Sequence, residues 1–101
     1  MTTVVAVSPG ACGLKTVITA VNEGDKVRIS VESECPMVRE WASKLPPLTA
    51  KDVLKSPFKS NIVYQIAGGH STCPVPCATL KAAEAELGLA VKRDVKIEFT
   101  E

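Results

Sequence analysis

The sequence predicts an α+β fold with two layers, a mostly antiparallel sheet of about four strands with helices on one face. Residues 26–32 and 95–99 alternate apolar with polar side chains, which is typical of strands with one face in water. Residues 75–87 have the apolar spacing of a helix, and a sheet with one wet face needs helices only on its other face. The length of 101 residues, without repeats or linkers, suits one domain over residues 1–101.

The strands are expected in order along the chain, each bounded by turn residues. Residues 2–7 end at a Ser-Pro-Gly turn, and residues 14–21 are rich in β-branched side chains. Residues 22–25, Asn-Glu-Gly-Asp, then lead into the alternating stretch 26–32, and residues 95–99 form the last strand. The side chains expected to face the core from the last two strands are Val27, Ile29, Val31, Val95, Ile97 and Phe99.

Helices are expected over residues 36–45, 49–55, 61–67 and 75–87. Pro36 suits a first helical turn, Trp41 falls on the apolar face of its helix, and Thr49 with Asp52 forms a capping box. The Ile, Val and Tyr of residues 61–67 also fit a strand, but a cap at Asn61 favours a helix. In the last helix we expect Leu80, Ala83 and Leu87 to be buried and Lys81, Glu84 and Glu86 to face water.

The composition is that of a globular, soluble protein. Hydrophobic residues make up 46% and charged residues 23%, and 12 basic against 11 acidic residues leave a net charge of +1. The basic residues are dispersed and aromatic residues make up 4%, so we expect no nucleic acid partner. No apolar run is long enough for a membrane, and the N-terminus lacks the pattern of a secretion signal. We therefore expect a cytoplasmic protein whose partner, if it has one, is another protein.

The four cysteines are placed so that the fold can gather them at one end of the sheet. Cys12 follows the first strand and Cys35 follows the third, so an antiparallel meander puts both at the same end. Cys73 and Cys77 open the last helix, which begins at that end if the final strand runs parallel to the first or third. We therefore expect all four cysteines and His70 at one pole.

A cysteine cluster of this kind predicts a metal or iron–sulfur site. Cytoplasmic thiols stay reduced, which favours metal or thiol chemistry over disulfides. Cys35 and Cys73 each precede a proline at a helix start, where the partial positive charge stabilises thiolates. The glycines at 10, 13, 68 and 69 allow close approach of backbone N–H groups.

The expected metal ligands are Cys12, Cys35, Cys73 and Cys77. Four thiolates can hold a tetrahedral Zn²⁺ or an iron–sulfur cluster, and the cysteine–proline pairs favour the cluster. Cys73 and Cys77 are four residues apart and face the same way if both lie within the helical turn. His70 would replace one thiolate or donate a hydrogen bond to one.

Two other hypotheses stay open. Cys73 could act as a thiol or persulfide sulfur carrier, with Cys77 as resolving thiol and His70 as proton acceptor. Alternatively the cysteines are buried as small hydrophobic side chains, and the domain has a structural or interaction role. The chain lacks a Cys-x-x-Cys knuckle, a nucleophile elbow and a phosphate-binding loop, so the sequence predicts no particular reaction.

Two family resemblances follow from these residues. Cys73-Pro74-Val75-Pro76, followed by a helix, resembles the Cys-Pro-x-Pro motif of small sulfur-carrier proteins, which implies that Cys73 would carry the sulfur. In that family the motif stands near the start of the chain and has no counterpart of Cys77. The overall layout is more similar to an uncharacterised family of small four-cysteine domains of anaerobic bacteria and archaea, in which His-x-x-Cys-Pro-Val-Pro precedes a helix and a final strand. This second resemblance implies a fold and candidate positions but no established function.

Overall fold

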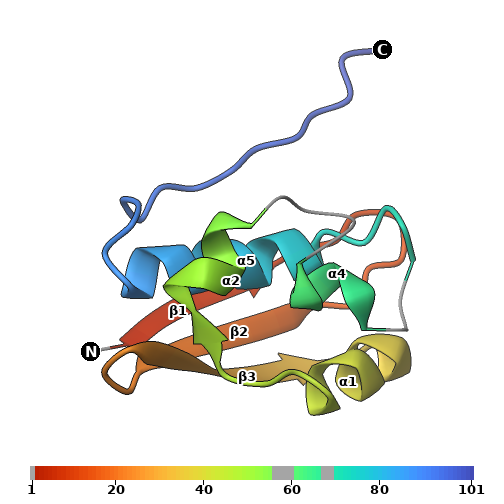
Figure 1. Ribbon diagram of the computed structural model, residues 1–101. Helices are drawn as coiled ribbons and strands as arrows, with labels where there is room; N and C mark the ends of the chain where they lie inside the picture. Colours follow the sequence, from red (N-terminus) through yellow and green to blue (C-terminus); the bar gives the residue numbers. More distant parts are fainter. Residues whose placement is uncertain (1, 56–60, 67–69) are drawn as a thin grey trace.

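The computed structural model describes residues 2–55, 61–66 and 70–101. Its sheet has four strands in the order β1-β2-β3-β4, and each neighbouring pair is antiparallel. The strands are β1 (Thr2–Val7), β2 (Thr16–Asn22), β3 (Lys26–Ser33) and β4 (Leu48–Thr49). Figure 1 shows β1, β2 and β3 as one layer beneath the helix that is labelled α5. The predicted small α+β fold with an antiparallel sheet is confirmed.

The strand register places the end of β1, the start of β2 and the end of β3 at the same end of the sheet. Val7, the last residue of β1, pairs with Thr16, the first residue of β2, and Thr16 pairs with Ser33, the last residue of β3. The loop 8–15 and Cys35 therefore lie at the same end of the sheet, as the predicted meander requires.

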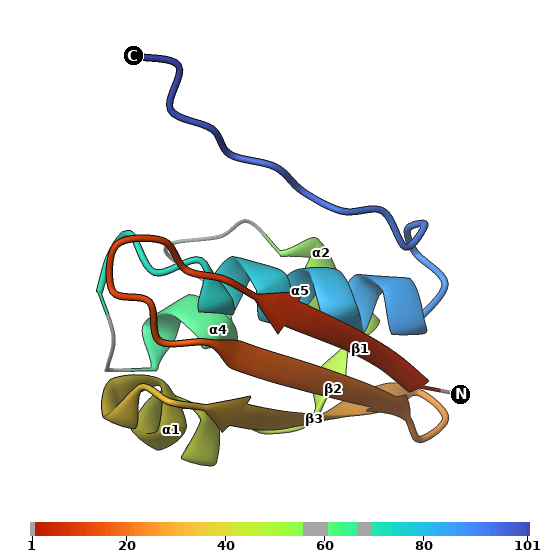
Figure 2. The same cartoon turned by 180° about the vertical axis from the view of Figure 1, so that it is seen from behind.

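The helices are α1 (Pro36–Ser43), α2 (Ala50–Leu54), α4 (Ile62–Gln65) and α5 (Val75–Glu86). The longest of them, α5, runs along the sheet over β1 and β2, as Figures 1 and 2 show from opposite sides. On the other face of β3 the charged and polar side chains of its alternating pattern are exposed, whereas Val27 is completely buried beneath the helices. No helix in the described ranges is both long and apolar enough to cross a membrane.

Local capping explains where the short helices begin. The Thr49 side chain accepts a hydrogen bond from the Asp52 backbone, and the Asp52 carboxylate accepts one from the Thr49 N–H at 2.9 Å. The Asn61 side chain accepts a hydrogen bond from the Val63 N–H at 3.0 Å, which begins α4. The helical interpretation of residues 61–67 is therefore confirmed for residues 62–65, and residue 67 lies outside the described ranges.

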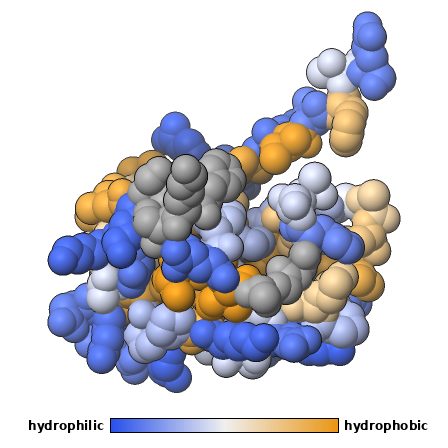
Figure 3. All heavy atoms as spheres, turned by 45° about the vertical axis from the view of Figure 1, so that its right-hand side comes forward, coloured by the Kyte–Doolittle hydropathy of each residue, from blue (hydrophilic) through white to orange (hydrophobic). Residues whose placement is uncertain are grey.

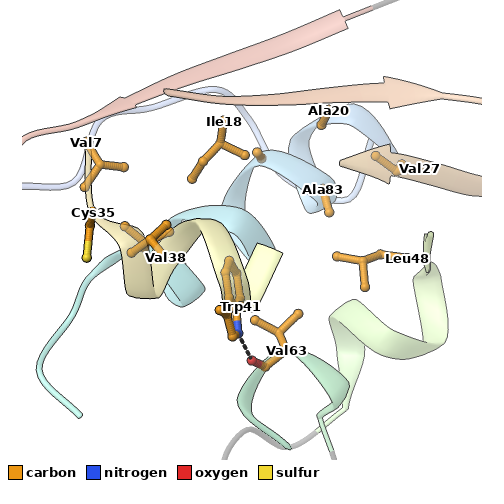
Figure 4. Packing of buried hydrophobic residues seen from close by; sticks show 12 residues of the cluster. Val7, Ile18, Ala20, Val27, Cys35, Val38, Trp41, Leu48, Val63 and Ala83 are labelled. Carbon is orange, nitrogen blue, oxygen red and sulfur yellow. Dashed lines mark hydrogen bonds between the residues drawn. The ribbon is translucent and has the colours of Figure 1, made fainter. Parts of the chain in front are cut away.

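The core lies between the sheet and the helices, and Figure 4 shows its packing. Trp41 of α1 is 3% exposed, and its indole N–H donates a hydrogen bond of 3.0 Å to the carbonyl of Val63. Because a buried indole needs a partner for its N–H group, this contact fixes α1 against α4. The expectation that Trp41 belongs to the core is confirmed.

One side chain of α5 was assigned to the wrong side of the helix. Glu86 is buried, whereas the helical pattern placed it in water. Its carboxylate accepts hydrogen bonds from the Thr3 hydroxyl at 2.8 Å and from the Asn22 N–H at 3.1 Å. A buried carboxylate is tolerated here because donors from two strands satisfy it.

The prediction of a final strand over residues 95–99 is wrong, because residues 89–101 form no helix or strand. The fourth strand of the sheet is instead the short β4, which pairs with the start of β3. Val95, Ile97 and Phe99 do not enter the core, and the last two are 86% and 98% exposed. Figure 3 shows this segment leaving the body with hydrophobic side chains in solvent. An alternating pattern fixes which side chains share a face, but a strand also needs a neighbour with which to pair.

Candidate functional site

A pocket of about 420 Å³ lies at the pole where β1 ends and β2 begins. Three of the four cysteines line it, together with His70. The complete lining among the described residues is Pro9, Ala11, Cys12, Leu14, Thr16, Cys35, Met37, Val38, His70, Thr72, Cys73, Pro74 and Val75. The pocket therefore draws on the β1–β2 loop, the start of α1 and the approach to α5.

The β1–β2 loop supplies Cys12, whose side chain is exposed. Gly10 and Gly13 flank it at φ +90° and +66°, a region that favours glycine because it has no Cβ. The Gly13 N–H donates to the Gly10 carbonyl at 3.0 Å, which closes a tight turn around Cys12. The other two glycines of the expected cluster, at 68 and 69, lie outside the described ranges.

Cys35 is buried at the junction between β3 and α1. Its N–H donates to the Ser33 hydroxyl at 3.0 Å, and that hydroxyl is 2.7 Å from the hydroxyl of Thr16 on β2. Figure 4 shows Cys35 beside Val7 at one end of the core. Cys35 is the N-cap residue of α1, and its side chain makes no capping hydrogen bond.

Cys73 is half-buried in the segment before α5, and its N–H donates to the His70 carbonyl at 3.1 Å. This turn brings His70, whose side chain is exposed, to the rim of the same pocket. The sequence analysis placed Cys73 at this pole by assuming a final strand parallel to the first or third strand, and that strand does not form. The direction of α5 places Cys73 here instead, because its C-terminal end is held at Thr3 and its start therefore lies at the other end of β1.

Cys77 does not line the pocket, although the sequence grouped it with the other three cysteines. The helix begins at Val75, so Cys73 precedes it and the spacing of four residues does not place both side chains on one helical face. Cys77 is exposed and lies beside Tyr64 of α4. Burial raises the pKa of the Tyr64 hydroxyl, and the charge and hydrogen bond of the Cys77 side chain raise it further.

The lining is rich in sulfur and poor in charge. The described residues of the lining include no aspartate, glutamate, lysine or arginine, and Met37 adds a thioether to the three thiols. The sequence analysis did not place Met37 at the site. Its position two residues after Cys35, in the first turn of a predicted helix, could have indicated that it lies close to that cysteine. Sulfur and imidazole select soft or borderline metals such as zinc and iron, whereas magnesium and calcium require oxygen ligands.

Three cysteines and His70 line one pocket, but among the described residues they do not form a ready set of ligands for one metal ion. In residues 2–55, 61–66 and 70–101, no three histidine, cysteine or carboxylate side chains are grouped so that they could hold one metal ion. The pocket thus brings Cys12, Cys35, Cys73 and His70 to one cavity.

Comparison with known proteins gives a family but no activity. No curated protein and no solved structure matches the chain. The model of a family of unknown function, DUF6951, matches residues 3–99, which include the pocket and most of the C-terminal segment. The chain therefore belongs to this family of unknown function.

Proposed function

We propose that the pocket binds an iron–sulfur cluster or a soft metal ion through the thiolates of Cys12, Cys35 and Cys73. The observation that supports this proposal is that three separate chain segments each bring one cysteine to the same cavity. His70 would serve as a fourth ligand or as a hydrogen-bond donor to a thiolate. Such a domain could transfer electrons, sense redox state or support a partner enzyme.

We favour a cluster over a single zinc ion, because no three ligand side chains in the described residues are grouped as one zinc ion requires. A zinc ion draws its ligands to bonds of about 2.3 Å, so its thiolates must nearly touch. A cluster of iron and sulfide occupies more space and can be held by thiolates that are too far apart to share one ion. Binding of a single zinc ion would require the loop 8–15 and the segment 70–73 to close around it.

Cys77 takes no part in this proposal, and it therefore provides a matched control. We propose comparing Cys12→Ser, Cys35→Ser and Cys73→Ser with Cys77→Ser after anaerobic purification. Iron, zinc and acid-labile sulfide would be measured together with the absorption spectrum. Each pocket variant should lose most of the bound metal, whereas Cys77→Ser should retain it. Because Cys35 is buried, Cys35→Ala and circular dichroism would separate loss of a ligand from loss of folding.

The proposal fails if the anaerobic protein is colourless, metal-free and unable to take up zinc or iron with sulfide. The sulfur-carrier hypothesis would then be favoured, because Cys73 is half-buried just before a helix, at the rim of a cavity that could hold a persulfide. In that case Cys73 should be trapped as a persulfide, and only Cys73→Ser should abolish trapping. Equal metal loss in Cys77→Ser would instead show that the site uses Cys77 and differs from the pocket described.

A further inference from the structure

Two parts of the described fold have the pattern of paired β-strands, but each has at least one edge without a neighbouring strand in the described residues. The first is the C-terminal segment, residues 94–100, in which Val95, Ile97 and Phe99 alternate with polar side chains. These three side chains are 58%, 86% and 98% exposed. The Lys96 ammonium forms an ion pair with the Glu98 carboxylate at 2.7 Å, so these two charged side chains lie on the same side of the segment, as residues two apart do in a strand.

The second feature is the free edge of β1. In the described part of the chain β1 pairs with β2 alone, so its other edge adjoins no strand. Natural edge strands are usually short or carry lysine, proline or other charges that prevent pairing. The opposite edge, β4, is two residues long, whereas β1 is six residues of sequence TTVVAV without a charge or proline. On the helix side of this strand Val5 is only partly buried.

We propose that residues 94–100 add as a strand to the free edge of β1 in a second copy of this chain, which gives its own segment in return. Pairing would satisfy the main-chain groups of both strands, and the apolar side of the segment would lie against the helix side of the partner's sheet. The segment's polar side, with Lys96 and Glu98, would remain in water. Mutual exchange of an identical strand closes under a two-fold rotation and yields a dimer.

The path of the segment favours a second copy over its own sheet. The Lys92 ammonium donates to the Thr2 carbonyl at 3.4 Å, so the segment begins beside the start of its own β1. Beyond this contact it leads away from the body into solvent, as Figures 1 and 2 show from both sides. The chain turns back after α5 and then runs in the direction of β1, but it diverges from the body along this course, so its side chains are presented to another molecule.

The first measurement is the molar mass of the full chain by sedimentation equilibrium over a range of concentrations. The expected result is twice the chain mass of 10.7 kDa at tens of micromolar and above. The double variant Ile97→Asp with Phe99→Asp should be monomeric with an unchanged circular dichroism spectrum, because neither side chain packs in the body. The matched control is Leu54→Asp, which is 71% exposed in α2 and outside both surfaces, and it should remain dimeric.

A second pair of measurements identifies the surface to which the segment binds. Val5→Lys places a charge on the helix side of β1, where the apolar side chains of the segment would lie, and should also give a monomer with an unchanged circular dichroism spectrum. Mixing it with the double tail variant should restore a dimer with one exchanged strand. A full chain that is monomeric at every concentration would overturn the proposal, as would a dimer that persists in the double tail variant. A folded Val5→Lys protein that still dimerises through its tail would show that tails pair with each other, which also contradicts it. These outcomes do not depend on the chemistry of the pocket.

Discussion

The hydroxyl of Thr3 donates a hydrogen bond of 2.8 Å to the carboxylate of Glu86, which joins β1 to the last turn of α5. The second carboxylate oxygen accepts the Asn22 N–H at 3.1 Å. These contacts connect residues from both ends of the described chain and set the direction of α5. Because that direction places Cys73 at the pocket, Glu86 positions the candidate site from the opposite end of the helix.

We predict that Glu86 makes stability depend on pH in the acidic range. The hydrogen bond from Thr3, with that from the Asn22 backbone and the nearby positive charges, lowers the pKa of Glu86 below its ordinary value of 4.5 despite desolvation. Its contribution is therefore complete above pH 4.5 and is lost as the pH falls through the lower, folded-state pKa. Thermal unfolding of Glu86→Gln should show a lower Tm than the parent at neutral pH, and the difference should shrink in acid.

Glu84→Gln is the matched control for this prediction. Glu84 lies on the same helix, and its carboxylate forms a surface ion pair with Lys81 at 3.9 Å. Surface pairs of this kind contribute little, so its Tm should follow the parent across the pH range. Parallel pH profiles for Glu86→Gln and the parent would contradict the assignment.

Trp41→Phe tests the contact between α1 and α4. The change removes the indole N–H from the carbonyl of Val63 and leaves that buried acceptor without its donor. The expected loss in the free energy of unfolding is about 1–3 kcal/mol, measured by urea titration. Leu54→Ala, at a side chain that is 71% exposed, should change the free energy by less than about 0.5 kcal/mol. Equal effects of the two changes would show that the hydrogen bond contributes nothing.

Asn61 combines a helix cap with a tertiary contact, and two substitutions can separate them. It is 1% exposed, its side-chain oxygen accepts the Val63 N–H, and its amide group donates to the Asp52 carbonyl at 2.6 Å. Asn61→Ala removes both and should cost about 1–3 kcal/mol in urea titration. Asn61→Ser keeps a good cap without reaching Asp52, so it should lie between the parent and alanine. A serine variant as unstable as alanine would mean that the cap is unimportant.

Tyr64 is the single tyrosine of the chain, so its ionisation can be followed directly by ultraviolet absorption. Desolvation raises its pKa above 10.0, with further increases from the charge and hydrogen bond of Cys77. Cys77→Ala should move the midpoint down, although it should stay above 10.0 because the desolvation remains. Since the folded-state pKa is raised, this group stabilises the fold below pH 10.0, and that contribution is lost as pH rises through the folded-state pKa. An unchanged midpoint in Cys77→Ala would show that the two side chains do not interact in solution.

Elements whose signals are local could be predicted from the amino-acid sequence. The alternation of residues 26–32 predicted β3, and the apolar spacing and proline at its start predicted α5. The capping box at Thr49 and the cap at Asn61 predicted short helices that the structure contains. These predictions hold because side-chain periodicity and capping act within a few residues, where the chain's own order fixes the neighbours.

Contacts between elements that are distant in the chain could not be predicted in this way. The alternation of residues 95–99 is as regular as that of β3, but no strand adjoins it in the described fold, so the segment remains outside the sheet. Glu86 is buried because donors from two strands lie opposite it, and no helical pattern records them. Cys77 is separated from the pocket because α5 begins two residues after Cys73 and not before it. Pairing, burial of a charge and convergence of ligands all depend on residues distant in the chain, and a local pattern cannot specify where those residues lie.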